Sequence, residues 1–582
     1  MIKEYEKLVK EFESDKKDKD FKELKIAVLS TYTLKNILYP LKYNLLISGY
    51  KPIIKFGGYN QFIQELMDES SFLYEFKPDV ILIALNSRSY LEDLEFTILD
   101  KNKKEINELI NEKVSFIKTA ILSTRLKSKI ILTNLDHFMY SPYGLMDISR
   151  DEGIHSAIEL FNNGLIEIKK ESKSLELLDF EKICSFYGKK NIFDEKMFFL
   201  GKILLSSLGA EKISEEFTLF IKAAYGKNKK VLVVDLDNTL WRGVVGEEGA
   251  LGIGIGEGPV GEIYKEVQKV ILNYKKMGVV IAISSKNNET DVSEVFSNNR
   301  NMILKSEDFI IKKINWQPKS LNIQSIAKEL NLGLDSFVFL DDNPAERLEV
   351  KTALPMIEVI DFPKDVALLP AILKEMPYFK SLSLTEEDKK RHEMYSLELK
   401  RNELKESYSI EEYLKKLETS ITVKIDDFEN IERIVQLINK TNQFNLRTKR
   451  YTLEQVKSMM ESREYSVYSL SVKDKFGELG LTGVIIIKDE GKDYFLDTFL
   501  LSCRILSRKI ENQFFLESIK SLRNDKLVHA EYIQSDKNEQ VKDFYDLLGF
   551  NLIEEDGKTK KYSKLLKDLF LTNIDWITVK NG

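Results

Sequence analysis

Short apolar runs alternate with longer amphipathic stretches over the first third of the chain. Four such runs occupy residues 25–30, 51–56, 79–85 and 129–134. Helix-length segments separate them, which is typical of a parallel sheet with crossover helices. We therefore predict an α/β domain at about residues 25–205. Residues 1–24 are dense in Lys, Glu and Asp and are predicted to be a charged lead-in without chemistry of its own.

The same alternation of apolar runs and helix-length segments occurs further along the chain. Apolar runs recur at residues 231–236, 279–285 and 336–342, with a helical pattern at 261–278 between the first two. This repeat predicts a second α/β unit, Rossmann-like, at about residues 228–378.

The pattern changes after residue 378. Residues 379–415 are highly charged with helical spacing and are predicted to form a linker. Strands are then expected at residues 419–425, 466–473, 482–488 and 493–502. The last two meet at the turn "KDEGKDY", so residues 416–582 are predicted to be an α+β domain with an antiparallel core.

Composition excludes several classes of protein. The 582 residues include 87 basic and 93 acidic side chains that are interspersed, for a net charge of −6, so no basic face favours nucleic-acid binding. No apolar run approaches the roughly 18 residues that a membrane helix needs, and no signal segment opens the chain. Two cysteines, Cys184 and Cys503, make a disulfide framework implausible. We expect a cytoplasmic protein that binds neither nucleic acid nor membrane.

Two carboxylates follow the strand at residues 231–234. Asp235 and Asp237 lie one residue apart at the carboxyl edge of a parallel sheet, where ligands bind in such folds. Alternate residues of an extended chain point to the same side, so both can reach one site. Carboxylates gathered there need a cation, and Mg²⁺ prefers such hard oxygen ligands.

Further polar clusters follow in an order typical of phosphoryl transfer. Ser285 and Asn287 follow the next strand, Lys319 comes later, and Asp341 with Asp342 ends the third strand. Each has a second interpretation. Ser285 and Asn287 are also suited to capping a helix that begins near Glu289, Lys319 to a solvated surface position, and Asp341 to capping the helix from Pro344 or supporting a metal ligand.

The order D-x-D-x-T, Ser, Lys and DD resembles the haloacid dehalogenase-like (HAD) phosphatases. "DLDNTLW", "SKNN" and "LDDNPAER" resemble the FkbH-like branch of that superfamily, as do "KTNQFNLRTKRYT", "DTFLLSCRILSRKIE" and "KNEQVKDFYDLLGF" nearer the C-terminus. The resemblance implies an SGNH-hydrolase-like N-terminal domain, a HAD core and a GNAT-like acyltransferase domain. "VLSTYTLKN" lacks the Gly-Asp-Ser turn of active SGNH hydrolases, which makes Ser30 a weak nucleophile candidate and favours a scaffold or docking role.

Carried over by motif, the resemblance implies roles for the clustered residues. Asp235 would accept phosphate as an aspartyl-phosphate, and Asp237 would act as acid and base. Mg²⁺ would be held by Asp235 and the backbone carbonyl of Asp237. One of Asp341 and Asp342 would complete the metal set, with Asp342 preferred. The implied substrate or phosphate-binding set is Thr239, Ser285, Asn287 and Lys319, with Thr239 expected to support its loop by hydrogen bonding.

The resemblance also implies acyl transfer. Family members take a glyceryl unit from 1,3-bisphosphoglycerate, carry it as a thioester and pass it to the phosphopantetheine thiol of an acyl carrier protein. Cys503 is the candidate thiol, with Arg504 and Arg508 nearby in sequence and His529 as a conceivable base. Alone, Cys503 would more often be a small buried hydrophobic residue.

Two residues depart from the family pattern, one beside the expected metal site and one in the turn after Cys503. Arg242 replaces a glycine after the Trp of the first motif, and Ser507 replaces a glycine after Cys503.

The alternative function is a stand-alone HAD phosphatase fused to a CoA-dependent N-acetyltransferase. That alternative needs a glycine-rich loop for the CoA pyrophosphate, and "CRILSRKIEN" contains no glycine.

Overall fold

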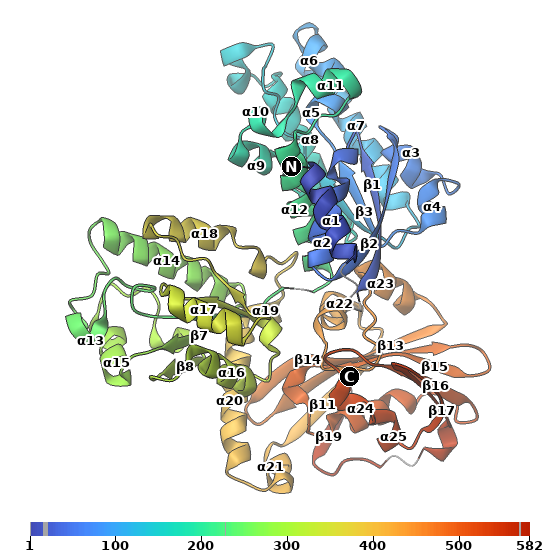
Figure 1. Ribbon diagram of the computed structural model, residues 1–582. Coiled ribbons are helices and arrows are strands. Elements are labelled where there is room, and N and C mark those ends of the chain that lie inside the picture. Colours follow the sequence, from blue (N-terminus) through green and yellow to red (C-terminus); the bar gives the residue numbers. More distant parts are fainter. Residues whose placement is uncertain (1, 15–20, 227, 570–571, 582) are drawn as a thin grey trace. The chain divides into compact units, whose positions relative to one another are not determined.

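The computed structural model describes the chain except for residues 1, 15–20, 227, 570–571 and 582. The chain divides into two compact units, which are described separately. Unit 1 comprises residues 1–225 with 452–456, and unit 2 comprises residues 226–451 with 457–582 (Figure 1). No described helix combines the length and apolar character needed to span a membrane.

A five-stranded parallel sheet forms the core of unit 1. Its strand order is β2-β1-β3-β4-β5. The strands are β1 (Lys22–Ser30), β2 (Tyr50–Tyr59), β3 (Val80–Ala84), β4 (Lys129–Thr133) and β5 (Leu175–Leu178). All four apolar runs predicted here are confirmed as strands, whereas β5 was not predicted. Helix α1 and the start of β1 lie within the predicted lead-in.

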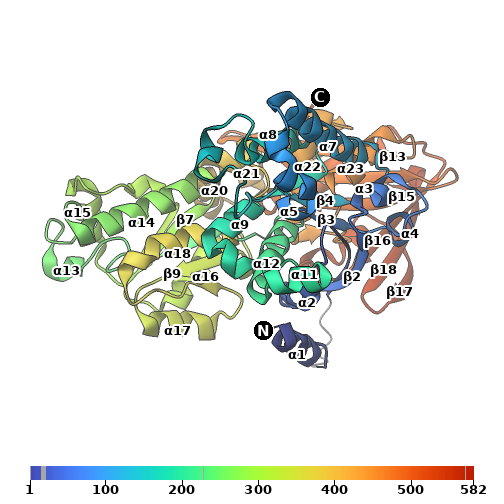
Figure 2. The ribbon, with the colours of Figure 1, turned by 90° about the horizontal axis from the view of Figure 1, so that it is seen from above.

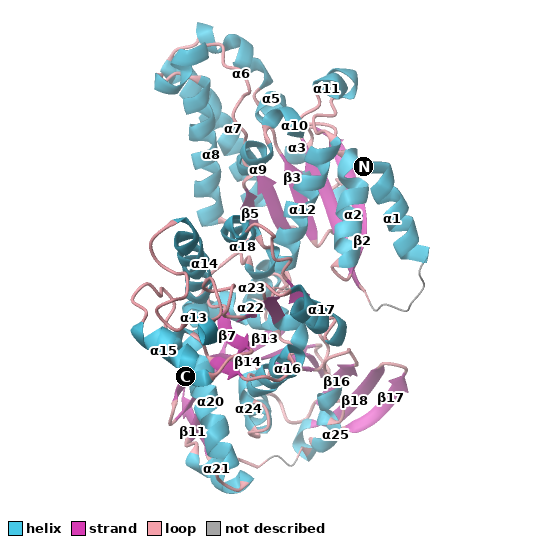
Figure 3. Cartoon of the chain, turned by 60° about the vertical axis from the view of Figure 1, so that its left-hand side comes forward, coloured by secondary structure: helices cyan, strands magenta, loops and turns pink. Residues whose placement is uncertain are grey.

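Helices cover both faces of this sheet because successive side chains of β1 point to opposite sides. Ala27 and Leu29 pack with α3, α7 and α8, whereas Ile26 and Val28 pack with α2, α9 and α12 (Figure 3). The helices of unit 1 before residue 225 are α1 (Ile2–Ser14), α2 (Leu38–Ile47), α3 (Phe62–Met67), α4 (Phe72–Phe76), α5 (Ser87–Tyr90), α6 (Glu92–Thr97), α7 (Lys103–Ser123), α8 (Ile154–Glu171), α9 (Phe180–Tyr187), α10 (Lys189–Ile192), α11 (Glu195–Gly201) and α12 (Ser207–Ala224).

Unit 2 opens with a second five-stranded parallel sheet of order β10-β9-β6-β7-β8. The strands are β6 (Val231–Val234), β7 (Val280–Ser285), β8 (Ile311–Ile314), β9 (Phe337–Leu340) and β10 (Glu358–Val359). Its helices are α13 (Val245–Glu248), α14 (Pro259–Lys276), α15 (Glu289–Asn298), α16 (Lys319–Glu329), α17 (Pro344–Ala353) and α18 (Leu369–Glu375). The three predicted runs are confirmed as β6, β7 and β9.

Both faces of this second sheet are covered as well. Leu232 and Val234 pack against α14, α15 and α18. Val231 and Val233 pack on the opposite face against α16 and α17 (Figure 2). Burial on both faces explains why β6 is continuously apolar up to the point where its carboxylates begin.

The rest of unit 2 contains a mixed sheet of order β17-β18-β16-β15-β14-β13-β11-β19, with β12 paired to β15. Its strands are β11 (Thr419–Ile425), β12 (Phe444–Asn445), β13 (Tyr465–Asp474), β14 (Gly477–Asp489), β15 (Tyr494–Leu501), β16 (Leu527–Ile533), β17 (Asn551–Asp556), β18 (Thr559–Leu565) and β19 (Ile577–Asn581). The helices from residue 386 onward are α19 (Glu386–Lys389), α20 (Arg391–Glu406), α21 (Ile410–Lys416), α22 (Ile431–Lys440), α23 (Leu453–Glu461), α24 (Ile510–Ile519) and α25 (Phe544–Leu547). Antiparallel pairing joins β11 to β13, β13 to β14 and β14 to β15, as predicted.

The charged stretch predicted as a linker is helical and anchored to the mixed sheet. Arg401 of α20 is fully buried, and its guanidinium donates to both carboxylate oxygens of Asp474 at 2.6 and 2.7 Å. A buried bidentate pair fixes geometry as well as charge, so α20 is part of the fold. The predicted fold class, a multidomain α/β chain with two parallel sheets followed by an α+β region, is confirmed.

Candidate active site and thiol pocket

The strand order of the second sheet reverses at β6, which lies between β7 and β9. Val234 is in register with Ile283 of β7 and with Leu340 of β9. The residues that follow these three strands therefore meet at one carboxyl edge. A crevice at such a reversal is where open α/β sheets bind their ligands.

Three carboxylates converge at this edge. Asp235, Asp341 and Asp342 each offer an oxygen, and these oxygens lie within 4.8 Å of one another. Lys319, at the start of α16, lies between two of them: its Nζ is 2.6 Å from Oδ1 of Asp235 and 2.6 Å from Oδ2 of Asp341. The Lys319 side chain is buried, so the surface interpretation of this lysine is wrong.

Burial and mutual repulsion set the charges of this cluster. Burial raises the pKa of Asp342 to about 6, and the charges of Asp235 and Asp341 act in the same direction. Burial and the charge of Asp235 also raise the pKa of Asp341. Burial alone would lower the pKa of Lys319, but Asp235 and Asp341 outweigh it and raise that pKa. The site thus holds more negative charge than its lysine balances and favours a further cation.

Hydrogen bonds distinguish the two carboxylates of the DD pair. Asp341 accepts from Lys319 and, at 2.8 Å, from the backbone amide of Asn343. Asp342 makes no ion pair with any residue that the structure describes. Asp342 is therefore the freer of the two to bind a metal, and Asp341 positions Lys319. The cap of α17 is Asn343, whose side chain accepts from Ala345, so Asp341 does not cap that helix.

The Asp237 carboxylate is held by three donors. Its Oδ1 accepts from the indole of Trp241 at 2.9 Å and from the amide of Val245 at 3.1 Å, and its Oδ2 accepts from Asn287 at 3.0 Å. Burial nevertheless raises the pKa of Asp237, and these hydrogen bonds act against that rise. A carboxyl group with a raised pKa is suited to exchanging protons.

Ser285 and Asn287 belong to this network and do not cap α15. The cap position of α15 is Asn288, and Asn287 donates to Ser285 at 3.1 Å as well as to Asp237. Both side chains are buried beneath the edge. The capping interpretation is therefore wrong, and both residues lie next to the candidate acid and base.

Thr239 and Arg242 lie in the loop that follows β6. The Thr239 side chain is fully buried and its hydroxyl accepts from the backbone amide of Asp342 at 3.2 Å. It joins two loops of the site, as the loop-support interpretation predicts, and is not exposed to a substrate. Arg242 is exposed. Burial raises the pKa of the nearby Tyr264 to about 12, and the charge of Asp342 raises it too, whereas the charge of Arg242 opposes the rise.

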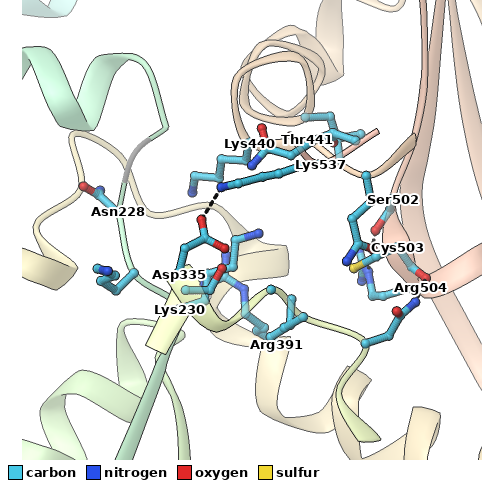
Figure 4. A pocket seen from close by; sticks show the side chains of 18 of the residues that line it. Asn228, Lys230, Asp335, Arg391, Lys440, Thr441, Ser502, Cys503, Arg504 and Lys537 are labelled. Atoms are coloured by element: carbon cyan, nitrogen blue, oxygen red, sulfur yellow. Dashed lines mark hydrogen bonds and ion pairs between the residues drawn. The ribbon is translucent and has the colours of Figure 1, made fainter. Parts of the chain in front are cut away.

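Cys503 lines a separate pocket of about 440 Å³ within unit 2. In Figure 4 its sulfur points toward the open middle of that pocket, with Lys440 and Lys537 on one side and Lys230 and Arg391 on another. The side-chain amide of Asn331, from the loop after α16, donates at 2.9 Å to the backbone carbonyl of Cys503. The pocket thus has walls from both the parallel and the mixed sheet regions of unit 2.

The cations that flank Cys503 in sequence face different ways. Arg504 lines the pocket and donates to Ser502 at 3.2 Å. Arg508 points to Asp474, with 3.3 Å between the charged atoms, and does not line the pocket. His529 lies on β16 beside Asp493, at 3.5 Å, and does not line it either. Arg508, although near Cys503 in sequence, does not face the thiol, and His529 is not placed to act as its base.

Sequence reasoning missed most of the positive charge around Cys503. Seven basic and two acidic side chains line the pocket: Lys229, Lys230, Arg391, Arg433, Lys440, Arg504, Lys537, Asp335 and Asp536. They come from segments far apart along the chain, so no local motif indicates them. The excess of cations makes this pocket a candidate anion site.

In unit 1, the carboxyl edge of the sheet holds a closed polar network. Ser30 donates to the backbone carbonyl of Tyr32 and so is held away from a nucleophile's role. Asp136 accepts from the Asn86 amide at 2.6 Å and from the Ser87 backbone at 3.2 Å. These contacts are consistent with the expectation that Ser30 is a weak nucleophile candidate.

Comparison with known proteins finds one matching family and similar solved structures. Residues 49–211 match the family described as the FkbH N-terminal domain. The chain is similar to the crystal structure of the N-terminal part of a Bacteroides fragilis protein containing a phosphatase domain, complexed with Mg. That match has 29% identity and a TM-score of 0.60, and covers 65% of this chain and 99% of that chain.

Other likenesses carry less weight. A putative acetyltransferase of the GNAT family from Desulfovibrio desulfuricans is 11% identical over 25% of this chain and 99% of that chain, with a TM-score of 0.21, which supports no conclusion. No curated protein matches the chain significantly. Residues 49–211 thus match the FkbH N-terminal domain, and most of the chain is similar to a structure that contains a phosphatase domain.

Proposed function

We propose that the chain is a bifunctional enzyme, a Mg²⁺-dependent phosphatase that also transfers a glyceryl unit from 1,3-bisphosphoglycerate to an acyl carrier protein. The observation that carries the phosphatase half is the convergence of Asp235, Asp341 and Asp342 within 4.8 Å around the buried Lys319. Similarity to a phosphatase domain crystallised with Mg supports the same half. The transferase half is supported by the placement of Cys503 in a cationic pocket.

The donor set fits Mg²⁺. The ion prefers hard oxygen ligands and few protein contacts, and keeps positions for water and phosphate. Asp235 and Asp342 supply carboxylate oxygens, and the backbone carbonyl of Asp237 is the third candidate ligand. When bound, Mg²⁺ would offset negative charge on the phosphoryl oxygens.

The residues then have defined roles in phosphate ester hydrolysis. A carboxylate oxygen of Asp235 attacks phosphorus, the bond from phosphorus to the ester oxygen breaks, and that oxygen takes a proton from Asp237. Asp237 next accepts a proton from water, whose oxygen attacks the aspartyl-phosphate and releases inorganic phosphate. Lys319, held by Asp341, offsets the charge that develops on the phosphoryl group.

The thiol performs the acyl step. The Cys503 thiolate attacks the acyl carbon of the acyl phosphate, an S–C bond forms, and the C–O bond breaks with inorganic phosphate leaving with the electron pair. The phosphopantetheine thiol of the carrier protein then attacks the thioester and frees Cys503. The remaining phosphate ester is removed at the Asp235 site.

Intact-protein mass spectrometry tests both halves. The protein is incubated with Mg²⁺ and freshly generated 1,3-bisphosphoglycerate, as wild type, Asp235→Asn and Cys503→Ala. We expect an acyl adduct on wild type, a phosphoglyceryl adduct heavier by one phosphate on Asp235→Asn, and no adduct on Cys503→Ala. After carrier protein is added, the adduct should disappear from the enzyme and appear on the carrier protein.

Two outcomes would contradict the proposal. A wild type that releases phosphate and never gains an adduct is a plain phosphatase. An acetyl adduct or acetylated amine formed from acetyl-CoA in a parallel incubation would instead favour the acetyltransferase alternative.

A further inference from the structure

The pocket around Cys503 contains two lysines for which no ion pair is found among the described residues. Lys230 precedes β6 and Lys440 ends α22, and neither makes an ion pair with a residue that the structure describes. Other basic residues of the pocket are balanced: Lys537 pairs with Asp335, Arg391 with Asp388, and Lys229 with Glu358 at 3.5 Å. Lys230 and Lys440 are therefore the two lysines of the pocket that are open to an anionic ligand.

The electrostatics of these lysines favour an anion in the pocket. Burial lowers the pKa of Lys440 well below its usual value, and Arg391, Arg433 and Lys230 lower it further. Burial also lowers the pKa of Lys230, and among its neighbours the charge of Cys503 opposes that shift most strongly. Like charges gathered in one half-buried pocket repel each other, and an anion that enters the pocket relieves this repulsion.

The size and position of the pocket narrow the class of anion. A volume of about 440 Å³ is in the range of small-molecule sites. The Cys503 sulfur faces these lysines across the open middle of the pocket, so one small ligand can contact both the thiol and the cations (Figure 4). Phosphate groups are well suited to a site built of several lysine and arginine side chains.

We propose that Lys230 and Lys440 bind the phosphate groups of the small phosphorylated acid that acylates Cys503, and so select the acyl donor. The identity of the donor rests on the proposed function, whereas binding of a phosphorylated acid beside Cys503 does not. On this assignment both lysines are positioning residues. Their loss raises KM for the donor more than it lowers kcat.

The first test measures binding without any turnover. Iodoacetamide alkylates Cys503, which is partly exposed, and not Cys184, which is fully buried. Alkylation of Cys503, followed by mass spectrometry, is titrated against 3-phosphoglycerate, inorganic phosphate and CoA. We expect protection by 3-phosphoglycerate in the wild type and at least tenfold weaker protection in Lys230→Gln and Lys440→Gln. Lys492→Gln, an exposed lysine of the β14–β15 turn, is the matched control and should behave as wild type.

Thermal unfolding shows whether these lysines instead serve the fold. Removing one of several neighbouring positive charges should leave the melting temperature of Lys440→Gln equal to that of wild type or higher. A clear decrease in melting temperature together with unchanged protection would overturn the assignment. So would protection by CoA at far lower concentration than by 3-phosphoglycerate.

The two proposals fail separately. If 1,3-bisphosphoglycerate never acylates Cys503 but 3-phosphoglycerate still protects it in a Lys440-dependent way, the anion site stands and the transferase function fails. If Cys503 is acylated and KM is unchanged in both lysine variants, the transferase function stands and the anion site fails.

Discussion

The Nζ atom of Lys319 lies 2.6 Å from Oδ1 of Asp235, and the ion pair is almost entirely shielded from solvent. The same ammonium contacts Asp341, which fixes it from a neighbouring strand. The lysine therefore sits beside the candidate nucleophile before any substrate arrives. Its charge is placed where negative charge would develop during phosphoryl transfer.

Lys319→Gln tests this arrangement. Phosphate release from 3-phosphoglycerate should fall about 10²–10³-fold in kcat, the range for removal of one preorganised electrostatic contact. Lys286→Gln is the matched control, because Lys286 is more exposed and pairs with Glu346 at 2.6 Å. A melting curve of each variant separates lost catalysis from the instability that a broken buried pair causes. Equal losses in both variants at equal stability would contradict the assignment.

Asp342→Asn should weaken Mg²⁺ binding. The substitution keeps the shape of the side chain but removes one negative charge from the three carboxylates that converge. We expect at least a tenfold loss of Mg²⁺ affinity, measured by calorimetric titration, with activity partly recovered at high Mg²⁺. Asp361→Asn, an exposed carboxylate on the same domain, should leave the affinity unchanged. Unchanged affinity in Asp342→Asn would move the metal site elsewhere.

Ser507→Gly should stabilise the region around the thiol. Ser507 has a φ of 62°, in the left-handed region that glycine adopts without a Cβ penalty. The turn after Cys503 thus has a conformation that glycine adopts more readily than serine. Relief of this strain is worth about 1 kcal/mol of unfolding free energy, which calorimetry of the full chain detects as a higher melting temperature. Ser507→Val should lower it, since a β-branched residue fits that conformation worse.

The stability of unit 1 should depend on pH through Asp136. Burial raises the pKa of this carboxyl to about 6, with Lys189 acting against the rise. The folded state therefore binds the proton more tightly than the unfolded state, whose carboxyl titrates near 3.9. The contribution is fully present below about pH 4 and is lost as pH rises through 6, a change of about 3 kcal/mol.

Hydrogen exchange resolves this effect within the full chain. After correction for intrinsic rates, amides of β3 and β4 should lose protection between pH 4 and pH 7 in the wild type. Asp136→Asn should flatten that dependence, because the titrating proton is gone. An identical pH dependence in both proteins would show that other groups control the stability of unit 1.

Sequence patterns predicted the strands that carry strong apolar signals. The runs at residues 231–236 and 279–285 became β6 and β7 because both faces of these strands are buried. Strands β5 and β8 are among those missed, and each carries charged residues within four positions: Glu176 in β5, and Lys312 with Lys313 in β8. Without a continuous apolar run, such a segment becomes a strand through pairing with its neighbour.

The same reasoning explains which site residues were found in advance. Asp235, Lys319 and Asp342 belong to motifs that end strands or begin a helix of one sheet, so topology alone brings them together. Lys230 and Lys440 are 210 positions apart in the numbering and meet only through packing of the two sheet regions of unit 2. No spacing rule along one chain reveals such a pair.

The hydrogen bond from Asn331 to the Cys503 carbonyl joins two sheet regions that should evolve together. The thiol pocket draws its walls from both sheet regions, so a gene fusion that exchanged only the C-terminal part would receive half of a foreign cavity. Lineages should therefore replace these two regions together or adjust their facing residues in step. Comparing descent of residues 228–336 with that of residues 433–537 would reveal such joint replacement.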